Sequence, residues 1–408
     1  MRRVVVTGFG GVTALGDEWP EIRDRMNAGE TGIKRLVEWD KYTDMNTRLG
    51  APVPEFSVAG RYPRKKLRSM GPVAQMAVYA TERALTDAGL TDDPLLGSGR
   101  MGTAYGSSFG STNPVIAFVE LLQQGTMRNL TATTYIKMMS HTSPVNIGIF
   151  FGLKGRIHTT SSACASGSQG IGYAYEAIKY GMQDAMVAGG AEELCPTMAA
   201  VFDSLYATST KNGEPETTPR PFDKDRDGLV IGEGATTLIL EELEHARARG
   251  ATIYAEVVGY GTNSDGSHVT QPAAETMELA MRTAIDDAGL APEAIDFVNG
   301  HGTATDRGDI AETRATSAVF GGQMPIHSLK SYFGHTLGAC GSMEAWLGIE
   351  MMREGSFVPT VNLDNIDPEC GELDYVVDES RSLDAEYLMS NNFAFGGINT
   401  SLIFRRWS

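Results

Sequence analysis

The sequence predicts an α/β protein built from two similar halves. Its 408 residues exceed what a single hydrophobic core usually serves. Short apolar runs alternate with stretches of helical spacing, which is the order of elements in α/β folds with mainly parallel sheets. Residues 257–261 echo residues 5–10, and residues 284–290 echo residues 84–90, in the same order. We therefore expect an N-terminal half over residues 1–250 and a C-terminal half over residues 251–408.

The first half alternates strands and helices. An apolar run from Val4 to Gly11 indicates a buried strand followed by a glycine turn. Pro72 is typical of a first helical position, and Gly89 is placed to end that helix. Further strands are predicted at Met101–Tyr105, Asp184–Glu193 and Ala235–Glu241, and a helix around Val115–Leu122. The connection over residues 203–228 is long enough to indicate a functional loop.

The second half repeats this order. Val257–Gly261 corresponds to the first strand, and the helix that ends near Gly289 corresponds to the helix that ends at Gly89. Gly334–Gly341, followed by the apolar helix Ala345–Met352, stands where the counterpart of the cysteine turn described below belongs. A site in a duplicated protein is expected where corresponding helix N-termini converge, which would bring the two small-residue turns together.

Composition excludes several classes of function. Lys and Arg number 34 against 51 Asp and Glu, and the resulting formal charge of −17 argues against nucleic-acid binding. The four cysteines show no paired metal spacing and are too few for a disulfide framework, which favours a reducing compartment. The N-terminal apolar run is too short for a signal peptide, and no stretch approaches the length of a membrane span. We expect a cytoplasmic protein without a membrane partner.

The segment Thr160–Gly170 surrounds Cys164 with small residues and predicts a reactive thiol. A short strand at Gly155–Thr160 leads into it, and helical spacing follows as far as Ile178. A cysteine just before or on the first turn of a helix lies near unpaired backbone N–H groups and the positive end of the helix dipole, which lowers the thiol pKa. The alternative is a buried structural thiol.

Two histidines of the second half lie in glycine-bounded turns. His301 and His335 each follow a run that indicates a strand end, where α/β folds place ligands. A lone histidine in a loop is usually structural, but one cysteine and two histidines in matching turns favour catalysis. Lys330 and Glu312 add a charged pair that could orient the site or form an ordinary salt bridge.

The segment Met389–Asn399 contains two phenylalanines and two adjacent glycines. Gly396 and Gly397 would let backbone N–H groups face a ligand, as in an oxyanion hole. The alternative is a glycine turn that packs the core aromatics Phe393 and Phe395.

These motifs resemble the elongating β-ketoacyl-(acyl-carrier-protein) synthases of KAS I/II type, in the thiolase-like superfamily. The resemblance spans the whole chain and rests on four ordered motifs, at Val4–Gly8, Ser162–Ala165, His301–Thr305 with Lys330–His335, and Phe393–Asn399. It implies a thiolase-like, five-layered α-β-α-β-α fold made from two duplicated halves. It also implies acyltransferase activity in fatty acid, polyketide or aryl polyene synthesis.

The resemblance implies a decarboxylative Claisen condensation. Cys164 would hold the acyl primer as a thioester while backbone N–H groups of Cys164 and Phe395 bind the oxyanion. His301 and His335 would donate hydrogen bonds to the enolate formed from malonyl-carrier protein. The resemblance also implies that Lys330 and Glu312 orient the site, that Thr303 and Thr305 contact the pantetheine arm, and that Phe395 gates the acyl pocket. In some relatives a structural monovalent cation is bound at the positions of Asn299, Glu344, Ser390 and Asn391.

The same resemblance predicts partners. No cofactor is expected on the enzyme, because phosphopantetheine arrives on the acyl carrier protein. That carrier is strongly acidic, so a basic docking patch is expected at Arg64, Lys65, Lys66, Arg68 and Arg128, unless these residues are only a solvated charge run. The chain is expected to form a homodimer or a heterodimer with a chain-length-factor-like subunit.

Three departures from the family pattern argue against a simple assignment to saturated fatty acid elongation. Tyr332 and Phe333 replace Met-Thr, Ala394 replaces a glycine, and Asp306–Arg307 replaces an apolar pair. Bulky aromatic residues near the second histidine could reshape the acyl or malonyl pocket. The sequence of residues Lys330–His335 resembles that of aryl polyene ketosynthases.

Three other assignments are weaker. A thiolase would need a second catalytic cysteine near the C-terminus, where the chain has none. The condensing enzyme that starts chains is expected to use Cys, His and Asn, whereas this chain presents a cysteine and two histidines. A noncatalytic chain-length-factor-like subunit would not need Cys164, His301 and His335.

Overall fold

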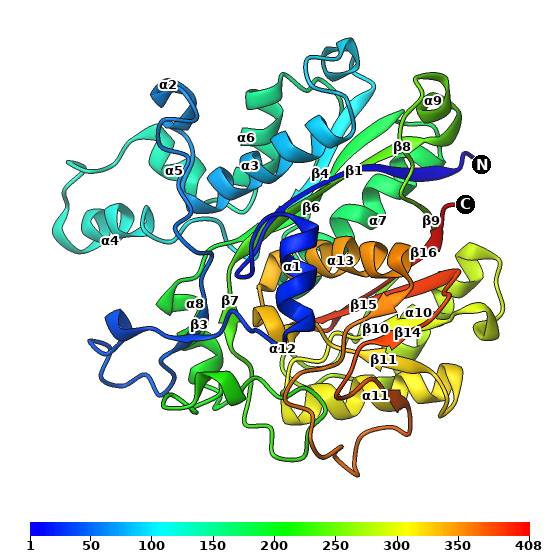
Figure 1. Cartoon of the computed structure of the whole chain (residues 1–408). Helices are drawn as coiled ribbons and strands as arrows, with labels where there is room; N and C mark the ends of the chain where they lie inside the picture. Colours follow the sequence, from blue (N-terminus) through cyan, green and yellow to red (C-terminus); the bar gives the residue numbers. More distant parts are fainter.

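The computed structural model describes all 408 residues (Figure 1). The strand order of its eleven-stranded sheet contains one topology twice. The N-terminal half has the strand order β5-β4-β6-β8-β1, and the C-terminal half has β11-β10-β15-β16-β9 with β13 outside β11. These strands are β1 Val4–Val12, β4 Met101–Gly106, β5 Ile157–Thr159, β6 Ala185–Glu192, β8 Gly234–Glu242, β9 Ala255–Ser264, β10 Phe297–Asn299, β11 Pro325–His327, β13 Asp374–Tyr375, β15 Tyr387–Ala394 and β16 Ile398–Arg406.

Each half pairs its strands in the same directions. The β5-β4 and β4-β6 pairs are parallel, and the β6-β8 and β8-β1 pairs are antiparallel. The C-terminal half repeats this series from β11 to β9. The prediction of mainly parallel sheets is therefore wrong, because β15 and β16 are joined by a tight turn that permits only an antiparallel pair. The halves join where β1 pairs with β9, and the predicted boundary at 250 and 251 falls in the connection before β9.

Helices lie on both faces of each half-sheet and complete the five layers (Figure 1). α3 (Pro72–Asp87) and α6 (Thr142–Phe151) cover the outer face of the N-terminal half, and α10 (Ala274–Ala288) and α11 (Asp306–Phe320) cover that of the C-terminal half. The central layer consists of α7 (Ser166–Lys179) and α13 (Cys340–Glu354). The fold is thiolase-like, as predicted.

The helix signals in the sequence have a simple cause in the packing. α3 buries Val73, Met76, Ala77, Ala80 and Ala84, which recur at helical spacing on the face toward β1. Gly89 then adopts a φ of +67°, a left-handed conformation that ends the helix at little cost. α13 is instead buried on every side from Cys340 to Met352, as expected for a helix enclosed between two sheets.

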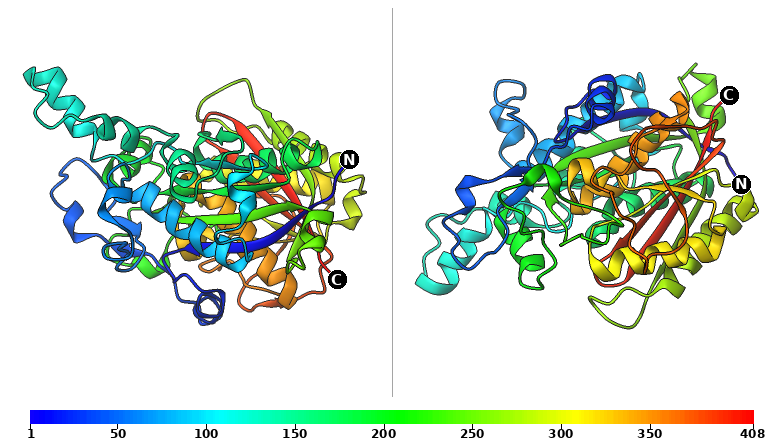
Figure 2. Two further views of the ribbon diagram at one scale, coloured as in Figure 1. Left: turned by 90° about the horizontal axis from the view of Figure 1, so that it is seen from above. Right: turned by 60° about the horizontal axis from the view of Figure 1, so that its bottom comes forward.

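The remaining elements flank these layers, and one of them, at residues 330–333, is itself fully buried. They are α1 Trp19–Asn27, α2 Arg64–Leu67, α4 Val115–Gln124, α5 Ala132–Met138, α8 Pro196–Asp203, α9 Leu243–Ala248, α12 Lys330–Phe333, and the short strands β2 Lys34–Arg35, β3 Leu49–Ala51, β7 Ile231–Gly232, β12 Ser356–Phe357 and β14 Arg381–Ser382. The pair α4 and α5 projects from the body (Figure 2). None of the helices is both long and apolar enough to cross a bilayer.

Candidate active site

The two small-residue turns meet at the N-termini of the central helices. Cys164 lies in a single 3₁₀ turn, Ala163–Ala165, directly before α7, and the corresponding turn of the second half, Leu337–Ala339, directly precedes α13. The duplication extends to the backbone, since Ala163 and Leu337 open their turns with φ values of +49° and +45°. Such conformations are unfavourable for residues other than glycine and cluster at functional sites.

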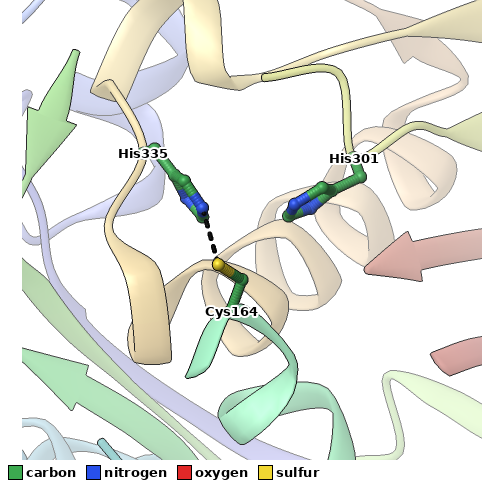
Figure 3. Close-up of side chains that lie close together, drawn as sticks. All are labelled: Cys164, His301 and His335. Atoms are coloured by element: carbon green, nitrogen blue, oxygen red, sulfur yellow. Dashed lines mark hydrogen bonds between the residues drawn. The ribbon is translucent and has the colours of Figure 1, made fainter. Parts of the chain in front are cut away.

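Cys164, His301 and His335 converge, as the sequence predicts (Figure 3). The Cys164 Sγ lies 2.9 Å from the His335 Nε2. The two imidazole rings are 5.2 Å apart between centroids and nearly perpendicular. All three side chains are buried, with at most 5% of each residue exposed.

Burial decides the charge state of these three groups. It raises the pKa of the Cys164 thiol to about 11, although the Phe395 N–H and the Lys330 ammonium act in the opposite direction. The prediction that the helix position lowers the pKa of this thiol is therefore wrong, because burial raises it by more. Burial, with the nearby Lys330, lowers the pKa of both His301 and His335 well below the usual value. At neutral pH the site holds a thiol and two neutral imidazoles.

A buried network fixes the tautomer of His301. The Lys330 ammonium lies 3.1 Å from the His301 Nδ1 and forms an ion pair with Glu344. Burial alone would lower the pKa of Lys330, but the Glu344 carboxylate raises it, so the amine remains charged. Because an ammonium can only donate, the His301 Nδ1 must accept, and the ring proton is on Nε2.

Glu312 does not pair with Lys330, contrary to the suggested charged pair. Its carboxyl group instead accepts the backbone N–H groups of His301 and Gly302, at 2.5 and 2.7 Å. Glu312 therefore holds the backbone of the His301 turn, while Glu344 is the partner of Lys330. No local sequence pattern indicated the contact between Lys330 and Glu344, because the two residues come from different helices.

Asn392 is a site residue that the sequence did not single out. Its amide donates to the Glu344 carboxylate at 2.7 Å and lies 3.4 Å from the His301 Nδ1 and 3.7 Å from the Cys340 Sγ. The Cys340 thiol in turn donates to the Cys164 carbonyl at 3.2 Å. The run of three polar residues, Ser390–Asn392, within an otherwise mainly apolar strand was the available signal for a polar site.

The glycine turn after β15 places a backbone donor at the sulfur. The backbone N–H groups of Phe395 and Cys164 both act on the Cys164 thiol, as an oxyanion hole at this position requires. Gly396 and Gly397 have φ values of +93° and +71°, so glycine is needed to make the turn. Phe393 lies beside His301 with 6.3 Å between the ring centroids, and Phe395 packs against Phe202.

A cavity of about 590 Å³ leads from the three catalytic candidates to the surface. Thr303 and Thr305 line it, and their hydroxyl oxygens are 2.9 Å apart. Phe202, Phe393 and Phe395 provide its aromatic wall.

Tyr332 and Phe333 do not line this cavity. Both are buried in the main hydrophobic core, and the Tyr332 hydroxyl donates to the Pro359 carbonyl. The expectation that they reshape a substrate pocket is therefore wrong. They belong to α12, so His335 follows a short helix and not a strand end as predicted.

The four positions suggested for a structural cation only partly fit. Asn299 and Ser390 are adjacent in the β10-β15 pair, and the Asn299 Oδ1 and Ser390 Oγ are buried without a protein partner. The Glu344 backbone carbonyl lies beside them and accepts the Asn299 amide. The Glu344 carboxylate is occupied by Lys330 and Asn392, and the Asn391 amide oxygen accepts the Ser401 hydroxyl. A monovalent cation would therefore be held by Asn299, Ser390 and that carbonyl, in a structural role.

The predicted docking residues are all exposed. Arg64, Lys65 and Lys66 belong to α2, Arg68 directly follows it, and Arg128 lies in the connection between α4 and α5. None of the five forms an ion pair with a carboxylate of the chain. The neighbouring Arg61 does, with Glu82.

Comparisons with known proteins agree with this geometry. Family models described as beta-ketoacyl synthase N-terminal domain and C-terminal domain match residues 1–246 and 254–364. A 3-oxoacyl-(acyl-carrier-protein) synthase 2 of Vibrio cholerae is 39% identical, and the match covers 99% of each chain. A crystal structure of a beta-ketoacyl synthase from Burkholderia phymatum is 60% identical with a TM-score of 0.99, and the match covers both chains completely.

Two further solved structures also match over the full length of both chains. The ishigamide ketosynthase/chain length factor is 32% identical, with a TM-score of 0.90. A ketosynthase chain in a structure of a type II polyketide acyl-carrier protein in complex with its ketosynthase bound to the hexaketide is 29% identical, with a TM-score of 0.88.

Proposed function

The chain belongs to the β-ketoacyl synthase family and is therefore a condensing acyltransferase, which joins an acyl primer to malonyl-carrier protein. We propose that Cys164, His335 and His301 carry out the two half-reactions of this condensation. The observation that most directly supports these roles is the 2.9 Å contact between the Cys164 Sγ and the His335 Nε2. The enzyme needs no cofactor of its own in this scheme.

In the first half-reaction Cys164 captures the acyl group. The sulfur attacks the thioester carbonyl while its proton passes to the His335 Nε2, which a neutral imidazole can accept. The carbonyl oxygen takes up negative charge between the N–H groups of Cys164 and Phe395. The bond to the pantetheine sulfur then breaks, and this sulfur takes the proton from His335. The result is an acyl-cysteine and a free carrier thiol.

In the second half-reaction the malonyl thioester loses carbon dioxide. The His301 Nε2–H donates to the thioester oxygen, and Lys330 keeps it in this tautomer. His335 donates as well in its Nε2–H tautomer, which is permitted because its Nδ1 has no protein partner. The enolate carbon attacks the acyl carbon, the Cys164 sulfur leaves, and one proton from solution is taken up overall.

Mass spectrometry of intact protein incubated with acyl-carrier protein tests the nucleophile. We expect an acyl adduct on the wild-type chain and none on Cys164→Ala, which keeps the fold because the residue is small and buried. His335→Ala should slow adduct formation by about 10²–10⁴-fold, the usual contribution of a general base. An adduct on Cys164→Ala at the wild-type rate would exclude Cys164.

We also propose that the pathway is aryl polyene synthesis. The sequence of residues Lys330–His335 supports this pathway through its resemblance to aryl polyene ketosynthases. The aromatic wall of Phe202, Phe393 and Phe395 offers flat faces against which a conjugated chain can pack. The adduct experiment repeated with saturated and polyunsaturated primers of equal length measures the preference. Faster capture of the saturated primer would overturn the assignment.

Carrier-protein docking is proposed at the basic residues Arg64, Lys65, Lys66, Arg68 and Arg128. Five exposed cations without acidic partners on a chain of charge −17 form a local positive surface for an acidic protein. The double variant Lys65→Glu, Arg68→Glu should slow transfer from the carrier at least tenfold, with a steep salt dependence. Reaction with a small acyl-pantetheine serves as the control, and equal loss on both substrates would contradict docking.

We propose that the chain associates through β5 and the α4–α5 projection. β5 is an edge strand with Ile157 half exposed, and α4 exposes Ile116, Val119 and Leu122 on one side. A second copy would form a homodimer, and a chain-length-factor-like subunit a heterodimer. Light scattering of the chain expressed alone distinguishes them, since a monomer would favour the heterodimer.

All four cysteines are free thiols, which suits the cytoplasm that we propose as its compartment.

A further inference from the structure

The segment from His301 to Arg307 runs outward along one wall of the catalytic cavity. Its alternate residues His301, Thr303, Thr305 and Arg307 all line that cavity. His301 and Thr303 are 5% and 8% exposed, Thr305 is half-buried, and Arg307 is exposed. A ligand that starts at Cys164 and leaves along this wall therefore meets an imidazole, then two hydroxyls, then a guanidinium.

Arg307 is the one arginine of the cavity lining that has no partner. It forms no hydrogen bond or ion pair with any residue, whereas Arg226, the other arginine of the lining, is nearly buried and contacts Asp367, the Asp223 carbonyl and the Asp306 carbonyl. A charged side chain at the mouth of the cavity is thus available for a ligand.

The acidic residues of the lining are already engaged. Asp227 accepts from the Ser209 hydroxyl and the Thr210 N–H, and Asp265 accepts from Asn399 and Thr276. Asp306, next to Arg307, lies 3.4 Å from an Arg226 nitrogen. Of these contacts, the one with Arg226 offsets the negative charge of Asp306, the carboxylate next to Arg307.

His268 adds a hydrogen-bond donor to the same cavity. Its Nδ1 accepts the Thr270 N–H at 3.1 Å, so the ring proton is on Nε2. His268 lines the cavity and is exposed, which leaves this N–H free to donate.

We propose that Arg307, assisted by His268, binds the phosphate of the phosphopantetheine arm. This inference rests on the proposed function, because it takes the thioester to lie at Cys164. From that end the arm presents a thioester, two amides and a phosphodiester, and the wall presents His301, the hydroxyls of Thr303 and Thr305, and Arg307 in the same order. A guanidinium suits this place because its planar donors match phosphate oxygens in pairs.

The test compares two small substrates that differ only in the phosphate, an acyl-phosphopantetheine and the corresponding acyl-pantetheine. The measured quantity is the second-order rate of Cys164 acylation, followed by mass spectrometry. Wild type should prefer the phosphorylated substrate by about fivefold at low salt, as expected for one exposed charge-assisted contact. The preference should decline when salt is raised from about 50 mM to about 500 mM, because the contact is exposed.

Arg307→Gln should abolish this preference without changing the rate with acyl-pantetheine, and Arg307→Lys should retain part of it. The matched control is Arg314→Gln, an exposed arginine of the same helix outside the cavity, which should behave as wild type. A preference that survives in Arg307→Gln, or an equal loss with both substrates, would overturn the inference. A loss confined to the intact carrier protein would also overturn it, since it would assign Arg307 to acidic side chains of the carrier. Failure of wild type to be acylated by either substrate would instead contradict the proposed function.

Discussion

At the scale of single residues, burial is the dominant influence on the catalytic groups. Cys164 stands where a helix dipole favours a thiolate, yet it is 3% exposed and its thiol pKa rises to about 11. The dipole contributes roughly 0.3–2 kcal/mol, which is less than the cost of placing an unpaired charge in an apolar site. In the mechanism that we propose, Cys164 is therefore activated during attack, by proton transfer to His335. This protects the resting thiol from adventitious electrophiles.

The alkylation rate of Cys164 tests this state. We expect reaction with iodoacetamide to be slow at pH 7 and to rise with pH beyond pH 9 without a plateau, because a thiol with a pKa of about 11 is still mostly protonated there. Cys370, which is partly exposed, is distinguished from Cys164 by peptide mass spectrometry. A plateau with an inflection near pH 7 would show a thiolate and contradict the burial argument.

At the scale of elements, the close approach of α7 and α13 positions the site. A Cβ on Gly341 would lie 2.6 Å from the Asn392 Oδ1 and 2.8 Å from the Ser168 backbone N, and one on Gly167 would lie 2.8 Å from the Ser342 backbone N. Neither glycine needs a positive φ, so their role is steric. Small residues at these points allow both helix N-termini to reach the cavity.

Gly341→Ala should therefore damage both stability and catalysis. The added methyl group must displace backbone or Asn392, for which we expect a loss of about 1–3 kcal/mol in the free energy of unfolding. Asn392 also contacts Glu344 and the His301 Nδ1, so the condensation rate should fall as well. Urea denaturation and a turnover assay measure the two effects. Gly213→Ala is the control, since nothing lies within 4 Å of a Cβ there, and equal behaviour of the two variants would contradict this packing.

At the scale of the whole molecule, buried titratable groups shape the dependence of stability on pH. Burial raises the pKa of Glu192 to about 7 and of Glu312 to about 8, so the native state retains protons that the unfolded chain releases. Their contribution is lost as pH rises through these values. Burial lowers the pKa of His301, His335 and His327, so their contribution is lost as pH falls below the unfolded value of 6.5. The two effects on stability oppose each other between the unfolded glutamate pKa of 4.5 and the unfolded histidine pKa of 6.5, and above that range only the glutamate effect remains.

We therefore expect the melting temperature to be highest between about pH 6 and pH 7 and to fall on both sides. Glu192→Gln should flatten the alkaline side, because the amide cannot release a proton while it still accepts the N–H groups of Ser108 and Gly338. The exposed Glu275→Gln should leave the profile unchanged. Melting temperatures measured from pH 5 to pH 9 test this, and a steady rise toward pH 9 would contradict it.

The sequence by itself determined the features that depend on local pattern. Periodicity located α3 and β1, and the echo between residues 84–90 and 284–290 indicated the duplication. The small-residue segment around Cys164 and the glycine-bounded turns of His301 and His335 marked these three residues as candidates. Only the tertiary structure decided the rest. Lys330 pairs with Glu344 and not Glu312, Tyr332 and Phe333 point into the core, and burial outweighs the helix dipole at Cys164. The physical reason is that helix and strand patterns arise from neighbours in the chain, whereas charge pairing and desolvation depend on segments that meet only when the two halves pack together.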